Sequence, residues 1–327
     1  MTGAPIYISA RETGHLLDRA CVLRVVEHAL REHSAKRLVN GSKGGFTLDD
    51  ENGQRHMGAI SGYDPASGIA GVKWFASCTG NPRKGLPRVP ATMLLCDSVT
   101  GALACVIDAT SLTIMRTAAL AIVASRACIT RRLKKAAIVG FGPIGETIGR
   151  YIQGTIDAAE VVIASKGRSA RVFAGIMTDA DGVRFRVEDR VEATVREADL
   201  VVTATGLSTD TPIVDAAWLK RGATVCSLGS CQEIDGRIAL RADRLFVDNW
   251  EASTLRGNLA PLIRSGALTR AQVTGEIADV VSGKIAGRIH DEQLVVIVLV
   301  GIGTLDIVLG AELLKQARER GIGRPLT

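Results

Sequence analysis

The sequence predicts an α/β protein that combines a Rossmann-type, doubly wound parallel-sheet domain with a second α/β domain. Three observations predict this fold class. The chain has 327 residues, enough for two domains of about 150 residues each. Strand-like and helix-like segments alternate from residue 135 onward, whereas residues 43–108 hold short strand-like runs broken by Gly and Pro. A G-x-G-x-x-G motif follows the first strand of the alternating region.

The composition excludes several classes of protein. Hydrophobic residues make up 46% and charged residues 23%, with 35 Gly against 9 Pro, which excludes disordered and fibrous chains. The net charge of +6 is small and spread along the chain without basic blocks, and aromatic residues make up only 4%. We therefore expect no nucleic-acid partner and a mild preference for anionic ligands.

The cysteines and the start of the chain indicate a cytoplasmic protein. The seven cysteines include no C-x-x-C pair, and most lie in apolar runs, where Cys behaves as a small hydrophobic residue. The first residues lack a basic segment followed by an apolar one, and the most apolar stretch, 293–303, is too short to cross a bilayer. We expect a soluble chain with no membrane partner and no bound metal.

The first part of the chain begins with helices and continues as a sheet. Ser9 and Glu12 form a capping box, and Asp18 is placed to cap a second helix. Short apolar runs then predict an antiparallel sheet with strands at residues 45–48, 71–75, 91–96 and 103–107. Residues 111–128 contain no Gly or Pro and are rich in Ala, Leu and Ile, which predicts a long, largely buried helix.

The region from residue 135 has the alternation of a doubly wound sheet. Strands are expected at residues 136–140, 161–164, 200–203, 223–227 and 245–247. A helix over 144–151 follows the first of them. This order implies a parallel sheet with right-handed crossovers. A last helix is expected over 305–320, ended by Gly321.

The motif after the first of these strands predicts a dinucleotide-binding site. Gly140 permits a tight turn, Gly142 lets the backbone approach a pyrophosphate, and Gly145 allows close strand–helix contact. Pro143 and Ile144 open the following helix, whose N-terminus attracts phosphate charge. A glycine-rich structural turn is the alternative, but the order of strand, motif and helix is that of a nucleotide site.

The end of the second strand bears on the choice between NADP and NAD. An acidic residue at this position binds the ribose 2′-OH of NAD. This chain instead has Ser165, Lys166, Gly167, Arg168 and Ser169, so two cations and two hydroxyls are available for a 2′-phosphate. We predict NADP as the preferred cofactor and NAD as the second candidate. The alternative is a solvated basic turn.

A later strand end belongs to the same predicted cofactor site. Thr203, Ala204 and Thr205 stand at the carboxyl end of the strand over 200–203, where ligands bind in open α/β sheets. Their small side chains leave room for a cofactor. A strand end that simply enters the turn at Gly206 is the alternative.

Several segments, in order along most of the chain, match the motifs of one known superfamily. They are Gly71-Val72-Lys73-Trp74, Met115-Arg116-Thr117-Ala118-Ala119, the VGFGPIG loop, Thr203-Ala204-Thr205 and residues 206–229. Together they resemble the ornithine cyclodeaminase/mu-crystallin superfamily. Within it, Lys73-Trp74, Asn81-Pro82, Leu95-Cys96-Asp97 and the tail GEIADVVSGKIAGRIHDEQ are most similar to the dehydrogenases of 2,3-diaminopropionate biosynthesis.

The resemblance implies a domain organisation and a reaction class. Residues 1–116 with 305–327 would form a substrate-binding and dimerisation domain, residues 117–304 the Rossmann domain, and the protein a homodimer. The implied activity is that of an NAD(P)-dependent oxidoreductase at the C–N bond of an amino or imino acid. The implied substrate is N-(2-amino-2-carboxyethyl)-L-glutamate, oxidised to diaminopropionate and 2-oxoglutarate.

Three alternative functions stay open within this resemblance. One is a ketimine reductase acting on pyrroline- or piperideine-2-carboxylate. The second is an ornithine cyclodeaminase, and the third is an NADPH-dependent binding protein of the mu-crystallin type.

Arg116 is the strongest candidate for a substrate-binding and catalytic residue. A cation in an apolar, Ala-rich helix is costly to bury unless it is paired, and a substrate carboxylate would pair it in bidentate fashion. From the residues alone, the alternative is an internal salt bridge to Asp97 or Asp108. The resemblance supports the carboxylate role and implies that Thr117 contacts a cofactor phosphate.

Two lysines complete the predicted basic set for substrate. Strand alternation places Lys73 on the face opposite Val72 and Trp74. A lysine in a partly dry cleft has its pKa lowered, which suits proton transfer to or from the substrate. An exposed lysine on the strand face is the alternative. Lys43 resembles the family's earlier basic residue at the substrate carboxylate, although glycines replace the bulkier neighbours.

Two acidic positions remain. The cyclodeaminases of the superfamily carry an Asp in the loop after Gly229, where this sequence has Cys231, Gln232 and Glu233. This departure counts against cyclodeamination and leaves Glu233 as a replacement base or a surface carboxylate. Asp306 matches a family acid near the cleft and is expected to be catalytic and to bind a substrate ammonium. The alternative is a charge that stabilises the start of the last helix.

Overall fold

The computed structural model describes residues 3–51, 53–178, 182–206, 211–229 and 232–326, without the side chains of Ser42 and Lys43. The chain divides into two compact units. The first unit contains residues Met1–Arg116 and Ile302–Thr327, and the second contains Thr117–Gly301. Each unit has its own sheet, so each is described separately.

The first unit is built on a seven-stranded sheet with the order β15-β1-β6-β5-β4-β3-β2. Its strands are β1 (Ile6–Ile8), β2 (Val39–Leu48), β3 (Arg55–Asp64), β4 (Ile69–Cys78), β5 (Ala91–Asp97), β6 (Leu103–Asp108) and β15 (Arg324–Pro325). Strands β2 to β6 pair in chain order and antiparallel, as the sequence predicts. β1 pairs with β6 in parallel, and β15 pairs antiparallel with β1 as the edge strand.

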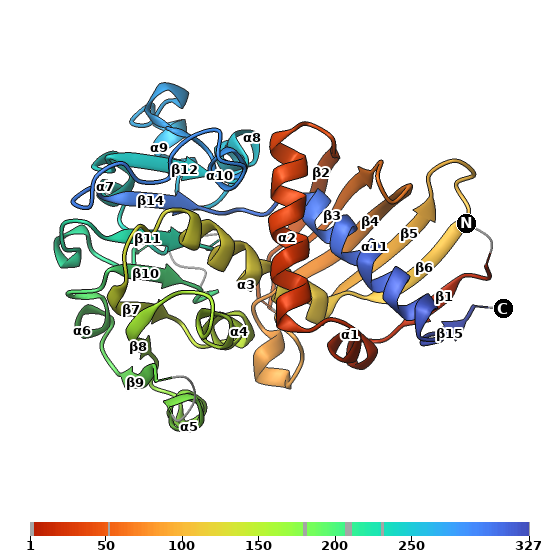
Figure 1. Cartoon of the computed structure of the whole chain (residues 1–327), viewed down its shortest axis with the longest axis horizontal. Helices are drawn as coiled ribbons and strands as arrows, with labels where there is room; N and C mark the ends of the chain where they lie inside the picture. The colour runs from red at the N-terminus through yellow and green to blue at the C-terminus, as the bar shows by residue number, and fades with distance from the viewer. Residues whose placement is uncertain (1–2, 52, 179–181, 207–210, 230–231, 327) are drawn as a thin grey trace. The chain divides into compact units, whose positions relative to one another are not determined.

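Helices cover one face of this sheet. They are α1 (Ala10–Leu16), α2 (Arg19–Ser34) and α11 (Gly303–Glu319), with a 3-10 turn η1 (Asn81–Lys84) between β4 and β5. The predicted caps are present: Ser9 and Glu12 form the capping box of α1, and the Asp18 carboxylate accepts from Cys21 N at 2.7 Å. α11 runs across the strands and packs on β3, β4 and α2 (Figure 1).

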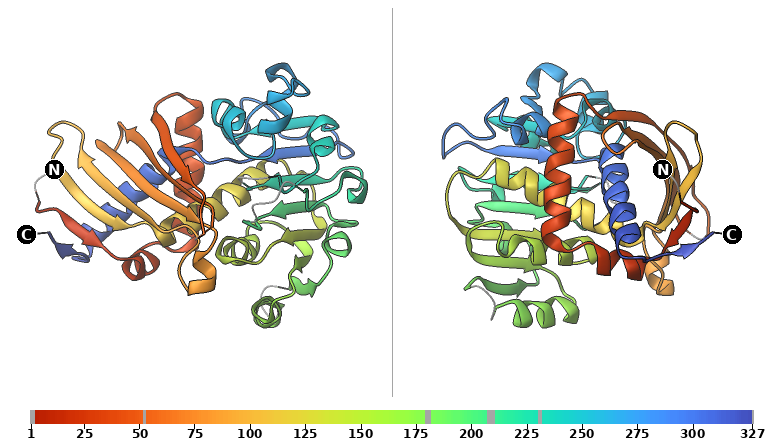
Figure 2. Two further views of the ribbon diagram at one scale, coloured as in Figure 1. Left: turned by 180° about the vertical axis from the view of Figure 1, so that it is seen from behind. Right: turned by 45° about the vertical axis from the view of Figure 1, so that its right-hand side comes forward.

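The second unit is an eight-stranded, all-parallel sheet with the order β13-β12-β14-β11-β10-β7-β8-β9 (Figure 2). Its strands are β7 (Leu133–Val139), β8 (Ala158–Ala164), β9 (Arg184–Glu188), β10 (Leu200–Thr203), β11 (Thr224–Ser227), β12 (Arg244–Val247), β13 (Gly275–Glu276) and β14 (Val295–Val298). The strand order reverses between β7 and β10, which is the switch point where ligands bind in doubly wound sheets. The predicted fold class is confirmed.

Short helices connect these strands. They are α4 (Pro143–Ile152), α5 (Arg168–Thr178), α6 (Val191–Val195), α7 (Gly236–Leu240), α8 (Trp250–Leu255), α9 (Ala260–Arg264) and α10 (Ile277–Val281), with 3-10 turns η2 (Ala216–Trp218) and η3 (Arg270–Gln272). The central strands β10, β11 and β14 are buried at every residue. This burial explains why apolar residues follow one another in β10 and β14, since strands covered on both faces lose the alternating pattern.

Helix α3 (Thr110–Ala127) links the two units, because the boundary between Arg116 and Thr117 falls inside it. The sequence predicts this helix one residue later at each end. Residues 118–124 are all buried, as expected of a helix that is apolar on every side. Across the described ranges, no helix combines the length and the apolar character needed to span a bilayer.

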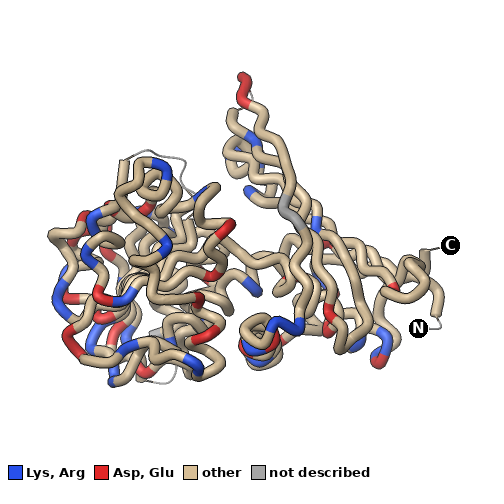
Figure 3. The backbone as a smooth tube through the Cα atoms, turned by 90° about the horizontal axis from the view of Figure 1, so that it is seen from above, with Lys and Arg blue, Asp and Glu red and all other residues tan. Residues whose placement is uncertain are grey.

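Charged residues of both signs are interspersed along each unit. Figure 3 shows Lys and Arg alternating with Asp and Glu instead of gathering in one long block. Within the described part of the chain, no group of three or more His, Cys, Asp and Glu side chains is arranged to hold a metal ion.

Candidate active site

Three predicted site residues meet inside the first unit. β4 carries Lys73, α3 carries Arg116, and the first turn of α11 carries Asp306. Lys73 Nζ lies 2.7 Å from Asp306 Oδ1, and Arg116 Nε lies 3.0 Å from the same oxygen. Lys73 Nζ also donates to Thr113 Oγ1 at 3.3 Å. Only 1% of Lys73, 1% of Asp306 and 8% of Arg116 is exposed. We call Lys73, Arg116 and Asp306 the ionic triad.

The triad carries one positive charge in excess, because two cations share one carboxylate. Burial raises the pKa of Asp306, but the charges of Arg116 and Lys73 outweigh this and hold it below its ordinary value. Asp306 Oδ2 is buried and has no hydrogen-bond partner among the described residues. Arg116 Nη1 and Nη2 likewise make no hydrogen bond to any described side chain or backbone group. The arrangement can therefore accept one anionic group at Arg116 and one donor at Asp306.

This geometry excludes two of the alternatives drawn from the sequence and leaves the third standing. Lys73 is buried while Trp74 is exposed, so the interpretation of Lys73 as an exposed lysine is wrong. Asp97 instead caps a turn by accepting from Thr100 N, and Asp108 accepts from Thr110 N; Arg116 pairs with neither of them. Asp306 lies in the first turn of α11, as the helix-start alternative requires, and it also pairs with Lys73 and Arg116.

Two further predicted residues are related to the triad, Lys43 by strand pairing and Thr117 by its position next to Arg116. Lys43 is in β2 and its backbone pairs with Ile60, which in turn pairs with Lys73 across β3 and β4. The Lys43 side chain lies outside the described part. Thr117 directly follows Arg116 in α3 and is half-buried.

We call the G-x-G-x-x-G loop, residues 140–145, the cradle. It has the geometry that its glycines require. Gly140 has a φ of +100°, and a Cβ there would lie 2.7 Å from Ala204 O. A Cβ on Gly145 would lie 2.2 Å from Gly140 O, so this glycine lets α4 approach β7. A Cβ on Gly142 would meet nothing within 4 Å. Gly142 is the N-cap of α4, with Pro143 at the first position and Ile144 next. These residues fit a pyrophosphate at the helix start.

Replacing Gly142 and Gly145 separately should distinguish the space for a ligand from the packing of the fold. Gly145→Ala is expected to lower the free energy of unfolding by about 1–3 kcal/mol, because the new methyl group would overlap Gly140 O. Gly142→Ala is expected to lower the free energy of unfolding by no more than about 1 kcal/mol, because Ala is a poorer N-cap than Gly. It should weaken dinucleotide binding at least about tenfold, since its methyl group would occupy the phosphate side. Urea unfolding and fluorescence titration measure the two effects. Equal effects of both variants on unfolding would contradict this assignment.

The carboxyl end of β10 lies beside the cradle. Ala204 N donates to Val139 O at 2.8 Å, which places residues 203–205 next to the end of β7. Thr203 is fully buried and its hydroxyl donates to Glu233 Oε2 at 2.6 Å, whereas Thr205 is half-buried. Glu233 is 1% exposed, so its interpretation as a surface carboxylate is wrong. Cys231 lies outside the described residues.

The predicted 2′-phosphate pocket lies at the end of β8. Gly167 N donates to Ser165 Oγ at 3.1 Å, which closes the turn. Lys166 and Arg168 are exposed, and α5 begins at Arg168. Neither cation forms an ion pair with any residue that the structure describes. The turn thus offers two unpaired cations next to two hydroxyls.

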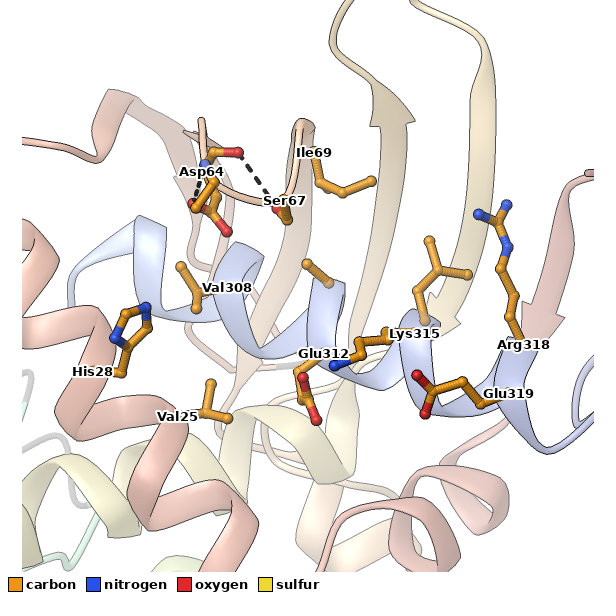
Figure 4. A pocket seen from close by; sticks show the side chains of 13 residues that line it. Val25, His28, Asp64, Ser67, Ile69, Val308, Glu312, Lys315, Arg318 and Glu319 are labelled. Carbon is orange, nitrogen blue, oxygen red and sulfur yellow. Dashed lines mark hydrogen bonds between the residues drawn. The ribbon is translucent and has the colours of Figure 1, made fainter. Parts of the chain in front are cut away.

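A cavity of about 570 Å³ lies elsewhere in the first unit, between α2, α11 and the turn joining β3 to β4 (Figure 4). It contains none of the predicted site residues. Asp64 at its edge accepts from Ala66 N at 3.0 Å, and Glu312 accepts from Gln316 Nε2 at 2.8 Å. Both acids are therefore engaged in local structure, and we assign no catalytic role to the cavity.

Comparison with known proteins supports the resemblance drawn from the sequence motifs. The family model for the ornithine cyclodeaminase/mu-crystallin family matches residues 7–321. The chain is 27% identical to a Delta(1)-pyrroline-2-carboxylate reductase of Bacillus cereus, covering 98% of this chain and 99% of the relative. It is 26% identical to an N-((2S)-2-amino-2-carboxyethyl)-L-glutamate dehydrogenase of Staphylococcus aureus, over 91% and 90% of the two chains.

A solved structure shares the whole fold. It is a Delta(1)-pyrroline-2-carboxylate reductase of Thermococcus litoralis, solved in complex with NADH and L-proline. The TM-score is 0.91 at 23% identity, with 98% of this chain and 100% of that chain covered. The family match spans both units and includes the segments of the ionic triad and of the cradle. The chain therefore belongs to the ornithine cyclodeaminase/mu-crystallin family.

Proposed function

We propose that the chain is an NAD(P)-dependent oxidoreductase that acts on the C–N bond of a small amino or imino acid, with reduction of a cyclic ketimine carboxylate as its reaction. The ionic triad carries this proposal. Its single excess positive charge matches a substrate with one carboxylate, such as pyrroline- or piperideine-2-carboxylate. The pyrroline-2-carboxylate reductase relatives, which match over nearly the full chain, support the same substrate class.

The triad residues divide the work of binding and proton transfer. The bound dinucleotide supplies a hydride to the imine carbon. Arg116 holds the substrate carboxylate through Nη1 and Nη2 while its Nε stays on Asp306. Lys73 is placed to supply the proton that the imine nitrogen takes up as the C=N bond becomes C–N. Asp306 fixes both cations and offers Oδ2 to a substrate N–H.

Dehydrogenation of N-(2-amino-2-carboxyethyl)-L-glutamate is the second candidate. The segments around Lys73-Trp74 and Asn81-Pro82 favour it, as does the Staphylococcus aureus relative. This substrate carries three carboxylates, so it would need cations beyond the ionic triad. Lys43 is the candidate in the sequence for one of them.

A substrate panel tests the proposal. The protein is incubated with NADPH or NADH and each cyclic ketimine, and with NADP⁺ or NAD⁺ and the glutamate conjugate, while the nicotinamide absorbance is followed. Consumption of NAD(P)H with a ketimine supports the reductase activity. Formation of NAD(P)H with the glutamate conjugate, and no turnover of the ketimines, supports the dehydrogenase activity. Ammonia release from ornithine without net cofactor change would indicate a cyclodeaminase. Tight cofactor binding with no turnover would indicate a binding protein.

We further propose that NADP is preferred over NAD, because Lys166 and Arg168 are exposed, unpaired among the described residues and next to Ser165. Replacing both cations with Ala is expected to weaken NADPH binding by at least about tenfold, since two charge-assisted hydrogen bonds to the 2′-phosphate would be lost. NADH binding should change less than about twofold, because NADH has no 2′-phosphate. Arg171→Ala, on the same helix but paired with Asp189, is the control. Equal losses for both cofactors would contradict the phosphate pocket.

We also propose a homodimer formed through the uncovered face of the first sheet. The exposed apolar side chains there include Phe46, Leu48, Trp74 and Leu94. Contiguous apolar patches of this kind mark interfaces. Leu94→Lys, on a side chain that is 41% exposed, is expected to raise the dimer dissociation constant at least about tenfold while leaving the monomer folded. Sedimentation equilibrium measures this, with Val99→Lys in a turn as control. An unchanged dimer would exclude this face.

A further inference from the structure

Four buried side chains of the second unit form a closed ring of hydrogen bonds. Asn258 Nδ2 donates to Ser227 Oγ at 2.7 Å, and Ser227 Oγ lies 2.9 Å from Thr203 Oγ1. Thr203 Oγ1 donates to Glu233 Oε2 at 2.6 Å. The next residue, Ile234, closes the ring by donating its backbone N–H to Asn258 Oδ1 at 3.1 Å. All four side chains are at most 4% exposed.

The chemistry of the groups gives the ring one direction. A backbone N–H can only donate, so Ile234 fixes Asn258 with its oxygen toward Ile234 and its NH2 toward Ser227. Ser227 accepts from this NH2 and passes its own hydrogen to Thr203, which passes its hydrogen to Glu233. The carboxylate of Glu233 is the final acceptor of the chain.

Glu233 holds the end of β10 by a second set of contacts. Its Oε1 accepts from Thr205 N at 2.7 Å and from Thr205 Oγ1 at 2.5 Å. On the other side, residues 204–205 lie directly against the cradle. A Cβ built on Gly140 would come within 2.8 Å of Thr205 Cα and within 2.7 Å of Ala204 O.

We propose that Glu233 is a positioning residue for the dinucleotide site. Its carboxylate sets the direction of the ring and thereby holds the β10 strand end against Gly140, which keeps the cradle in the shape that binds the cofactor. The cofactor part of this proposal rests on the proposed function. The ring itself involves only this chain's own groups, so it is tested separately.

The direction of the ring predicts an unusual pattern of variants. In Glu233→Gln, the amide oxygen has to face the Thr205 N–H, which can only donate, so the new NH2 group faces Thr203. Thr203 would then donate to Ser227, and Ser227 to Asn258. This turns the Asn258 NH2 group toward the Ile234 N–H, so that two donors face each other. Asn258→Asp adds a second carboxylate to the same ring. In the double variant, the new amide at position 233 donates to Thr203, and Thr203 donates to Ser227. Ser227 then donates to the new carboxylate at position 258, which still accepts from Ile234, so each bond of the ring again has one donor and one acceptor.

Gly229 gives an independent route to the same residue. A Cβ on Gly229 would lie 2.5 Å from Glu233 Cγ and Cδ, while no backbone atom is among its closest neighbours. Gly229→Ala therefore displaces the Glu233 side chain without changing any group that bonds within the ring.

The experiment combines urea unfolding with dinucleotide titration by fluorescence, applied to the full chain. Glu233→Gln and Asn258→Asp are each expected to lower the unfolding midpoint, and the double variant is expected to recover part of the loss. Glu233→Gln and Gly229→Ala should each weaken dinucleotide binding by about tenfold and raise its KM more than they lower kcat. Glu276→Gln is the matched control, since Glu276 is half-buried at a strand end outside the ring and accepts from Trp250 N.

Two results would overturn the proposal. A double variant at least as unstable as the sum of the single losses would show that the ring has no preferred direction. If the double variant recovers stability but Glu233→Gln alone binds the dinucleotide as tightly as the wild type, Glu233 has no positioning role. If the wild-type chain binds no dinucleotide, the proposed function fails, and the stability cycle still decides whether the ring exists.

Discussion

Replacing Arg116 with lysine is expected to lower kcat/KM for the imino-acid substrate by about a hundredfold or more, although the charge is kept. Arg116 uses Nε for Asp306, which leaves Nη1 and Nη2 for a carboxylate. A lysine has one nitrogen and cannot hold both partners in a fixed plane. Most of the loss should appear in KM if the carboxylate is held equally in the substrate and the transition state.

The measurement compares steady-state kinetics of Arg116→Lys with those of Arg126→Lys. Arg126 is an exposed arginine in the last turn of the same helix, so this control carries the same chemical change away from the triad. A wild-type kcat/KM in Arg116→Lys would remove the carboxylate role. Equal losses in both variants would point to a general effect on α3.

Replacing Asp306 with asparagine is expected to have the largest effect on stability, at about 3–5 kcal/mol, because it leaves two buried cations without their carboxylate. Asp306 is 1% exposed and accepts from Lys73 and Arg116. Urea unfolding at neutral pH measures the loss. Asp49→Asn, at an exposed carboxylate after β2, is the control.

The effect of Asp306→Asn should also depend on pH. The folded pKa of Asp306 lies below its ordinary value, because Arg116 and Lys73 outweigh the cost of burial. The carboxylate therefore contributes its full stability above the unfolded pKa of about 3.9, and the contribution is lost as the pH falls through the folded pKa. The difference in the free energy of unfolding between wild type and Asp306→Asn should become smaller below about pH 4. A difference that stays constant into strong acid would contradict this account of the triad.

The parts of the fold that the sequence predicts well have local causes. The turn after β7 needs Gly140 for its φ of +100° and Gly145 for the approach of α4, and both requirements are visible within about ten residues of sequence. The capping box of α1 is equally local. The predicted antiparallel and parallel sheets follow from such segments and their order.

The sequence pattern does not predict strand β3, and the reason is physical. Its glycines depress strand propensity, yet a larger side chain would be crowded at both positions. A Cβ on Gly58 would lie 3.0 Å from Gly44 O and from a ring atom of Phe75, and one on Gly62 would lie 3.2 Å from Ile307. The neighbours that crowd these glycines come from β2, β4 and α11, so no pattern within β3 itself reveals them.

The partners within the site were the least predictable feature. Arg116 and Asp306 are 190 residues apart, and the nearer carboxylates Asp97 and Asp108 are used in turns. Glu233 follows a loop with no strand or helix pattern, and its burial depends on threonines of another strand. The one signal that was present is the threonine pair at 203 and 205, whose hydroxyls at a buried strand end require acceptors.

Helix α3 carries the proposed carboxylate-binding Arg116 and the proposed phosphate-contacting Thr117 as neighbours on one uninterrupted rod. Consecutive helical residues are separated by a fixed rise of about 1.5 Å, so their spacing cannot be lengthened by insertions as a loop can. The spacing of these two backbone positions along α3 is therefore fixed by the helix itself.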